Sequence, residues 1–270
     1  MPPGPAVLAI DVRGLTRRFG DFTAVDDLTL AVRPGLIYGL LGSNGAGKTT
    51  LIKMLTTLLP PSEGDAVVAG VSILDAPAEV RRHIGYVPQM LSADGMLTGR
   101  ENLVFSARLY GIAAAERGPR IAEALRFMEL EDAGDRLVKV YSGGMIRRLE
   151  LAQAMLHRPA VLFLDEPTIG LDPLARHAVW DRLRTMRHDF DMTVLLTTHD
   201  MEEAQAMCDE LAILHAGRLA VAGRPAELCA AISPTATLDD VFAAHCGGTI
   251  AHGGGFADTR EARATARRLG

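Results

Sequence analysis

Hydrophobic and polar positions near the start of the chain follow the pattern of strands rather than helices. Residues 7–12 and 28–32 roughly alternate apolar and polar side chains, as strands buried on one face do. Residues 36–41 form a short apolar run, which fits a strand buried on both faces. A helix is expected over residues 48–59, because two prolines follow it directly and would stop it.

The middle of the chain changes to a helical pattern. Thr98 and Glu101 have the spacing of a capping box, which predicts a helix ending at about Gly111. Two further helices are expected, one beginning at Pro119 and reaching residue 128, and one over residues 142–157.

Strands and helices alternate again in the last part of the chain. Residues 161–164 and 193–197 read as buried strands, with a helix between them that Asp172 caps and Pro173 starts. A closing hairpin is expected over residues 210–221. Because strands that alternate with helices usually lie parallel, the predicted class is α/β with a mostly parallel sheet.

The composition of the chain excludes some classes of function. Its 270 residues are 48% hydrophobic and 23% charged, as in ordinary globular proteins. The net charge of −5 argues against a nucleic-acid partner, since such proteins usually carry a basic surplus. Three scattered cysteines, Cys208, Cys229 and Cys246, suggest a reduced intracellular protein.

Neither a membrane span nor a secretory signal is evident in the sequence. The most apolar stretch, residues 151–164, is interrupted by polar residues and a proline, so it falls short of the ~20 apolar residues that a span needs. Residues 1–6 carry no basic side chain, unlike the start of a signal peptide. If the protein works at a membrane, we expect another chain to supply the spanning part.

A glycine-rich segment between a buried strand and a helix carries the first chemical signal. It matches G-x-x-x-x-G-K-[ST], the phosphate loop whose backbone N–H groups surround phosphate oxygens at a helix N-terminus. Lys48 is expected to reach the β- and γ-phosphates of ATP, and the Thr49 hydroxyl to bind Mg²⁺. The predicted nucleotide contacts here are Gly42, Ser43, Asn44, Gly45, Ala46, Gly47, Lys48, Thr49 and Thr50.

Two carboxylates follow the apolar strand at residues 161–164. The carboxyl end of a parallel strand lies at the edge of the sheet where the phosphate loop also lies. Asp165 is therefore a candidate ligand of Mg²⁺, and Glu166 a candidate base that polarises the attacking water. Two acids at a strand end are usually just solvated, so this interpretation depends on the upstream phosphate loop.

Taken together with several later motifs, these residues resemble the nucleotide-binding subunit of an ATP-binding cassette (ABC) transporter. The resemblance covers about residues 7–225. The later motifs, in chain order, are Gly85-Tyr86-Val87-Pro88-Gln89, Tyr141-Ser142-Gly143-Gly144-Met145, Asp165-Glu166-Pro167-Thr168, Ile169-Gly170-Leu171-Asp172 and Thr197-Thr198-His199-Asp200. The resemblance implies a P-loop NTPase core, an N-terminal antiparallel β subdomain and an inserted helical subdomain.

The resemblance also implies roles for individual residues. Gln89 would reach Mg²⁺ or the attacking water, His199 would contact the γ-phosphate, and Phe19 would stack on adenine. Ser142, Gly143 and Gly144 would bind the γ-phosphate of ATP held by a second nucleotide-binding subunit. In the family's common motif, leucine and glutamine stand where this chain has tyrosine and methionine, but the serine and both glycines remain.

The same resemblance predicts domain boundaries and partners. The expected division is an ATPase domain over residues 1–245, with a core at 7–89 and 159–225, a helical subdomain at 90–158 and a C-terminal extension at 226–245, followed by a flexible basic tail at 246–270. A homodimer of cassettes is expected on the cytoplasmic side of the cell membrane. Residues 90–110 would contact a separate transmembrane permease.

Several motifs are most similar to the ATP-binding subunits of daunorubicin-type drug exporters of the ABC-2 group. They are the Tyr-Ser-Gly-Gly-Met segment with the residues after it, the segment 98–103, and the late segment 238–242. Three alternatives stay open at this point: an importer subunit, a soluble ABC ATPase without a transport role, and a regulatory cassette that does not hydrolyse ATP. The presence of Glu166 and His199 argues against the last.

Overall fold

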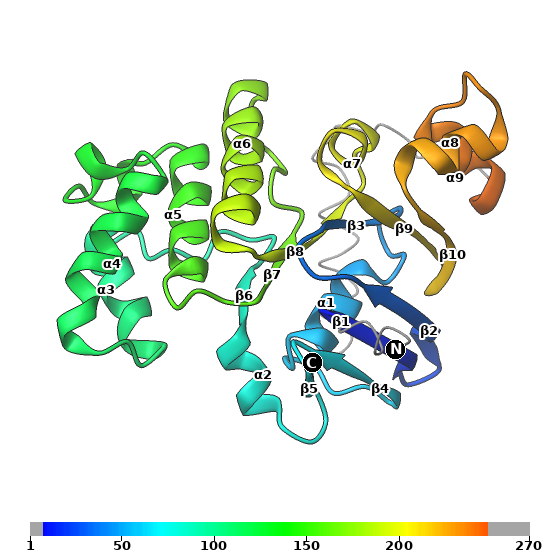
Figure 1. Ribbon diagram of the computed structural model, residues 1–270, viewed down its shortest axis with the longest axis horizontal. Coiled ribbons are helices and arrows are strands. Elements are labelled where there is room, and N and C mark those ends of the chain that lie inside the picture. Colours follow the sequence, from blue (N-terminus) through cyan, green and yellow to red (C-terminus); the bar gives the residue numbers. More distant parts are fainter. Residues whose placement is uncertain (1–7, 248–270) are drawn as a thin grey trace, which may run out of the picture.

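The computed structural model describes residues 8–247, and helices and strands alternate along most of this chain (Figure 1). The strands are β1 (Ile10–Phe19), β2 (Phe22–Val32), β3 (Ile37–Leu41), β4 (Glu63–Val68), β5 (Val71–Ser72), β6 (Ile84–Val87), β7 (Val161–Asp165), β8 (Thr193–Thr198), β9 (Glu210–His215) and β10 (Arg218–Gly223). The α-helices are α1 (Lys48–Leu55), α2 (Pro77–His83), α3 (Gly99–Leu109), α4 (Ala114–Phe127), α5 (Gly143–Met155), α6 (Pro173–Phe190), α7 (Met201–Met207), α8 (Pro225–Ile232) and α9 (Leu238–Cys246). Two 3₁₀ turns, Glu131–Ala133 and Val138–Val140, lie between α4 and α5.

A six-stranded sheet in the order β10-β9-β3-β8-β7-β6 forms the centre of the fold. All neighbouring strands in it run parallel except β10, which returns antiparallel to β9 as the expected hairpin. The prediction of a mostly parallel sheet is therefore confirmed. Because the sheet is parallel, the carboxyl ends of β3, β7 and β8 meet at one edge.

Alternate residues of the central strands face two different hydrophobic cores. In β3, Leu40 packs into a core shared with α1 and the N-terminal strands, while Leu41 packs into a core shared with α5, α6 and α7. In β7, Phe163 and Leu164 divide in the same way. The sheet is thus buried on both faces, which explains the uninterrupted apolar runs in its strands.

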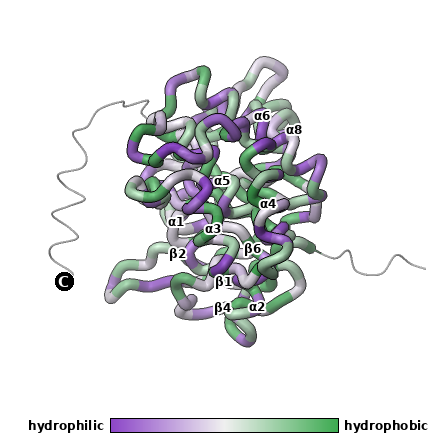
Figure 2. Tube along the Cα trace, turned by 90° about the vertical axis from the view of Figure 1, so that its left-hand side faces the viewer, coloured by the Kyte–Doolittle hydropathy of each residue, from purple (hydrophilic) through white to green (hydrophobic). Residues whose placement is uncertain are grey.

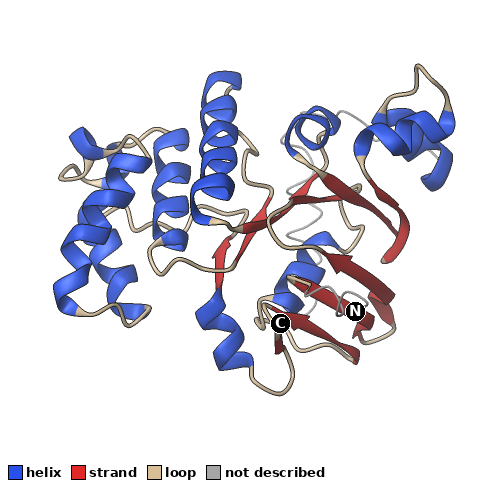
Figure 3. Ribbon diagram, in the orientation of Figure 1, coloured by secondary structure: helices blue, strands red, loops and turns tan. Residues whose placement is uncertain are grey.

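The N-terminal part forms a second sheet, in the order β2-β1-β4-β5, with antiparallel pairing throughout. This confirms the expected antiparallel β subdomain. Figure 3 shows this sheet beside the central one, with α1 next to both. The register pairs Phe19 with Phe22 at the tight end of the β1–β2 hairpin.

The helical region inserted between β6 and β7 forms a separate group on one side of the molecule (Figure 1). Helix α3 begins with the predicted capping box, because the Thr98 hydroxyl accepts the Glu101 N–H while Glu101 accepts the Thr98 N–H. Seen from that side, the helices mix apolar and polar positions, as expected where each buries one face (Figure 2).

Two predicted helix boundaries were wrong. Helix α1 ends at Leu55 rather than at residue 59, because Thr57 takes a left-handed conformation with φ of 60°. Helix α4 begins at Ala114, so Pro119 lies inside it rather than at its start. A proline there removes one hydrogen bond to the Ala115 carbonyl, and residues 113–116 are exposed, so water can satisfy that oxygen.

The chain beyond the central sheet ends in a helical pair, α8 and α9, that packs together beside β10 (Figure 1). The expected basic tail, residues 246–270, lies outside the described residues except for its first two positions. Within residues 8–247, no helix has both the length and the apolar composition that a bilayer crossing requires.

Candidate active site

The loop between β3 and α1 is shaped by close backbone contacts at two of its glycines. A Cβ on Gly42 would lie 2.6 Å from the Leu214 carbonyl oxygen, and one on Gly47 would lie 2.5 Å from that of Ala24. Gly47 also has a φ of +102°, which side chains rarely allow. The glycines of the sequence motif are therefore required by packing, and α1 begins directly behind them at Lys48.

A cavity of about 350 Å³ lies over this loop. That volume is in the range of small-molecule sites. The lining residues are Phe22, Ala24, Asn44, Gly45, Ala46, Gly47, Lys48, Thr49, Thr50, Gln89 and Glu166. Most of the predicted nucleotide contacts thus line one cavity together with two predicted catalytic residues, Gln89 and Glu166.

Lys48 is buried beneath the loop and bound to its backbone. Its Nζ donates to the Gly42 carbonyl at 2.7 Å and to the Ser43 carbonyl at 3.1 Å, and lies 3.8 Å from Glu166 Oε1. Burial lowers the pKa of Lys48, although the negative charges of Glu166 and Asp165 oppose this effect. The ammonium is thereby held at the place where a terminal phosphate would meet the loop.

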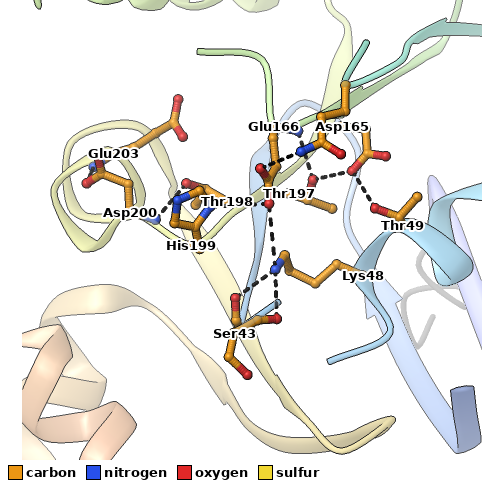
Figure 4. Close-up of polar contacts among 12 residues, drawn as sticks. Ser43, Lys48, Thr49, Asp165, Glu166, Thr197, Thr198, His199, Asp200 and Glu203 are labelled. Carbon is orange, nitrogen blue, oxygen red and sulfur yellow. Dashed lines mark hydrogen bonds and ion pairs between the residues drawn. The ribbon is translucent and has the colours of Figure 1, made fainter. Parts of the chain in front are cut away.

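Asp165 ends β7 and joins three elements of the site (Figure 4). Its Oδ1 accepts hydrogen bonds from Thr49 Oγ1 at 3.0 Å and from Thr197 Oγ1 at 2.7 Å. Thr197 also accepts the backbone N–H of Glu166 at 2.9 Å. A hydroxyl and a carboxylate oxygen are hard donors of the kind that Mg²⁺ prefers beside phosphates, so these residues fit the predicted metal site.

Glu166 is contacted by the side chains of Gln89, His199 and Lys48, which come from three other segments. Figure 4 shows His199 and Lys48 beside it. Gln89 Nε2 donates to its Oε2 at 3.1 Å, and His199 Nδ1 lies 3.2 Å from its Oε1. The backbone of Glu166 has a φ of 49°, an uncommon conformation for a residue with a side chain. The structure thus brings together Lys48, Gln89, Glu166 and His199, all four of the predicted catalytic residues.

Within this cluster, Glu166 and His199 each favour the charged form of the other. Burial raises the pKa of Glu166, but the hydrogen bond and charge of His199, with smaller effects of Lys48 and Gln89, outweigh it and hold that pKa below its ordinary value. The hydrogen bond to Glu166 raises the pKa of His199 in turn. Glu166 is therefore ionised near neutral pH, as its predicted role as a base requires.

Phe19 and Phe22 lie across from each other at the end of the β1–β2 hairpin. Phe22 lines the cavity, whereas Phe19, the residue predicted to stack on adenine, does not. The Arg17 guanidinium lies over one face of the Phe19 ring, 4.6 Å from its centroid. The assignment of Phe19 stays a prediction, and Phe22 is a second aromatic candidate that the sequence pattern had not indicated.

The predicted second anion site lies at the N-terminus of α5. Ser142 caps this helix by accepting the Met145 N–H at 3.3 Å, and Gly143 is exposed. Ser142, Gly143 and Gly144 are not among the residues that line the cavity in the described part of the chain. One copy of the chain therefore does not bring this helix end to its own phosphate loop.

Sequence reasoning overlooked the role of Thr197, which bridges Asp165 and the Glu166 backbone. The residue was visible within Thr197-Thr198-His199-Asp200, but only the pairing of β7 with β8 places its hydroxyl beside both acids. It also overlooked Ala24, which reaches the loop through the packing of β2 against it.

Comparison with known proteins agrees with this geometry. Residues 25–169 match the family described as ABC transporter. The Nod factor export ATP-binding protein I of Ralstonia nicotianae is 44% identical over 230 residues, which cover 84% of this chain and 71% of that protein. The daunorubicin/doxorubicin resistance ATP-binding protein of Streptomyces peucetius is 47% identical over 220 residues, covering 82% of this chain and 66% of that protein.

Solved structures share the fold. The structure of an ATP-binding subunit of an ABC transporter has a TM-score of 0.78 and 31% identity, covering 88% of this chain and 99% of that one. A dimeric ATP-binding cassette in a post-hydrolysis state has a TM-score of 0.72 and 24% identity, covering 80% of this chain and 98% of that one. At this identity, the likeness supports the fold alone. The phosphate loop, the paired acids and these likenesses together show that the chain is an ATP-binding, ATP-hydrolysing subunit of the ABC transporter family.

Proposed function

We propose that two copies of this chain enclose two MgATP molecules between them and hydrolyse them to power a membrane exporter. The observation that carries this proposal is the division of the site into two parts. The phosphate loop and Glu166 line one cavity, with Asp165 bonded to Thr49 beside it, while the N-terminus of α5 lies outside the cavity lining and carries an exposed glycine. A facing copy could bring its own α5 to the open side of that cavity, which would complete the site.

The residues of this chain would divide the chemical work among them. Lys48 and the loop N–H groups bind and orient the β- and γ-phosphates, and Glu166 takes a proton from the attacking water. Gln89 and His199, both bonded to Glu166, would orient that water and the carboxylate. Thr49 and Asp165 would hold Mg²⁺, which when bound neutralises charge on the phosphate oxygens.

Exposed apolar side chains support the proposed contact with a permease. Over residues 90–110, six large hydrophobic side chains are exposed: Met90, Leu91, Met96, Phe105, Leu109 and Tyr110. The first two follow Gln89 directly, so a partner on this surface would sit next to a residue that bonds Glu166. Exposed apolar side chains that form a patch often mark an interaction site. An apolar segment of the permease would cover these side chains. The chain would then work at the cytoplasmic side of the cell membrane.

Export rather than import is favoured by the names of the relatives above, one described by Nod factor export and one by daunorubicin/doxorubicin resistance. At 44% and 47% identity, these proteins match most of the chain. We extend export of an amphipathic or drug-like substrate to this chain as part of the proposal. An importer subunit is the alternative, and ATPase stimulation by an export permease rather than by an import permease would distinguish the two.

Substitution of Glu166 tests the proposed dimer. Glu166→Gln keeps the size of the side chain but removes the base, so turnover should fall by about 10²–10⁴-fold. ATP should still bind, and the unhydrolysed nucleotide should hold two chains together. Gel filtration with light scattering, with and without MgATP, measures this. A variant that binds ATP yet stays monomeric at all concentrations would contradict the shared site.

A further inference from the structure

Two oppositely charged side chains are buried within helix α5, three positions apart. Arg147 and Glu150 each expose only 2% of the side chain, and Arg147 Nη1 lies 3.0 Å from Glu150 Oε2. Burying such a pair seldom adds net stability, because desolvation of both charges offsets their attraction. Within residues 8–247, Arg147 Nε is also buried without a hydrogen-bond partner. The pair therefore needs an explanation other than stability.

The partners of this pair all lie in one short segment, residues 88–92, which follows β6. Arg147 donates from Nη1 to the Pro88 carbonyl at 2.8 Å and from Nη2 to the Gln89 carbonyl at 2.9 Å. Glu150 Oε1 accepts the Ser92 backbone N–H and, at 3.0 Å, the Ser92 hydroxyl. The cation thus binds the beginning of the segment and the anion binds its end.

The segment held in this way connects the active site with the surface. At its beginning, the Gln89 side chain donates to Glu166. In its middle, Met90 is 82% exposed and Leu91 is 52% exposed. Directly beyond β6, the backbone at Gln89 and on both sides of these two exposed residues is therefore hydrogen-bonded to side chains of α5. Any displacement of α5 would be transmitted to Gln89 through Arg147.

We propose that Arg147 and Glu150 are positioning residues that make residues 88–92 and helix α5 move as one body. Gln89 would then take its place beside Glu166 only when the N-terminus of α5 is itself placed for the facing subunit. Hydrolysis would in this way depend on the position of the helical region. The inference rests on the proposed roles of Gln89 and Glu166 in hydrolysis.

The neighbouring arginine supplies a matched control. Arg148 follows Arg147 on α5, but it donates to the Met128 carbonyl at 2.9 Å and lies 3.5 Å from Glu129 Oε2. It therefore ties α5 to the end of α4, and within residues 8–247 it makes no hydrogen bond or ion pair with residues 88–92. A substitution there disturbs the same helix without touching the segment that carries Gln89.

Lysine at position 147 gives the first test. Arg147→Lys keeps the buried charge but loses the planar fork that reaches two carbonyls at once. In the full-length chain, we expect kcat at saturating MgATP to fall by roughly 10- to 100-fold, as for small misplacements of catalytic groups, while the Kd for MgATP changes less than about twofold. Arg148→Lys should leave kcat within about twofold of wild type. If Arg147→Lys does not fold, Glu150→Gln takes its place in the same measurements.

A double-mutant cycle then separates positioning from a structural role. If Arg147 acts through Gln89, adding Arg147→Lys to Gln89→Ala should lower kcat by less than about twofold further. An unchanged kcat in Arg147→Lys, or the same loss of kcat in both backgrounds, would overturn the inference while leaving ATP hydrolysis by the wild type intact.

Hydrogen exchange provides a readout that does not depend on turnover. The Ser92 amide is bonded to Glu150, so it should exchange at least about tenfold faster in Arg147→Lys and at the wild-type rate in Arg148→Lys. Equal exchange rates of this amide in wild type, Arg147→Lys and Arg148→Lys would contradict the inference. This result does not depend on whether the proposed function is correct.

Discussion

The two ends of the proposed site differ in how complete they are within one chain. Around the phosphate loop, Lys48 is bound to backbone carbonyls, Asp165 bridges two hydroxyls, and Glu166 contacts Gln89 and His199. At the start of α5, Gly143 is exposed, and the Ser142 hydroxyl caps its own helix. The first region is arranged in advance by internal bonds, whereas the second is exposed and, in the proposed dimer, would be completed by the nucleotide of the facing subunit.

This difference teaches where control of hydrolysis can lie. A preformed cluster of charges lowers the reaction barrier without reorganisation, but it works only when every donor is in place. If one set of donors comes from a second subunit, a chain can bind ATP alone yet hydrolyse it slowly. The comparison predicts that damage at the two regions has different consequences for binding and for turnover.

The largest effect is expected from a charge placed at the exposed helix end. In Gly143→Asp, the new Cβ has space, with Leu171 Cδ2 the nearest atom at 3.5 Å. An acid in the first turn of a helix stabilises it by about 0.3–1 kcal/mol, so the fold should not suffer. It would repel the phosphate of a facing subunit's ATP, and turnover should fall at least about 10²-fold. Thermal unfolding and steady-state ATPase assays check both statements.

Unaltered turnover in Gly143→Asp would show that the start of α5 never meets nucleotide. Gly144 is a poorer position for this test, because a Cβ there would lie 2.9 Å from that of Ala175 and would disturb the packing itself.

A smaller effect is expected at the aromatic end of the first hairpin. Stacking of a base on an aromatic ring is worth about 1–3 kcal/mol, or roughly 5- to 150-fold in affinity. Arg17 lies over one face of the Phe19 ring, so the predicted stacking of adenine would use the other face. We expect Phe19→Ala to weaken ATP binding more than Phe22→Ala, measured by titration calorimetry. The opposite order would move the stacking role to Phe22, which lines the cavity.

The smallest effect concerns pH and the pair formed by Glu166 and His199. The hydrogen bond to Glu166, opposed in part by burial, raises the pKa of His199 above its ordinary 6.5. For Glu166, burial acts to raise the pKa, but His199 outweighs it and lowers the pKa below the ordinary 4.5. A histidine whose pKa is raised in the folded state stabilises the fold at low pH, and this stabilisation is lost as pH rises through the folded pKa. A carboxylate whose pKa is lowered in the folded state stabilises the fold at higher pH, and this stabilisation is lost as pH falls through the folded pKa.

The charged pair should therefore stabilise the nucleotide-free chain in full between about pH 4.5 and 6.5, and less on either side. Urea unfolding of wild type and His199→Gln at several pH values measures the difference in free energy of unfolding. A difference that does not vary with pH would show that the two side chains do not share a charge.

The chemistry of the site could be predicted from the sequence because its residues are encoded locally. A glycine loop between a strand and a helix, and acids at the end of a buried strand, meet at one edge whenever the strands lie parallel. For this reason the sequence alone predicts that Lys48, Asp165 and Glu166 share one site, and the structure brings them together.

What could not be predicted depends on contacts between distant segments. Arg147 and Glu150 look like ordinary surface charges of a helix, and only the packing of α5 against residues 88–92 buries them. Helices α2, α7, α8 and α9 were not delimited, because they are short and their pattern is weak. The predicted start of α4 at Pro119 was wrong, because residues 113–116 are exposed and water can satisfy the carbonyl that the proline leaves without a partner.

Mixing two inactive variants tests the shared site most directly. Lys48→Ala destroys the phosphate loop of its own chain, and Gly143→Asp destroys the helix end that serves the other chain. In a mixed dimer, one site carries both defects and the other carries none. Equal amounts of the two should therefore recover about a quarter of wild-type turnover, since half the dimers are mixed and each has one intact site. Activity no higher than that of the separate variants would contradict a site built from two chains.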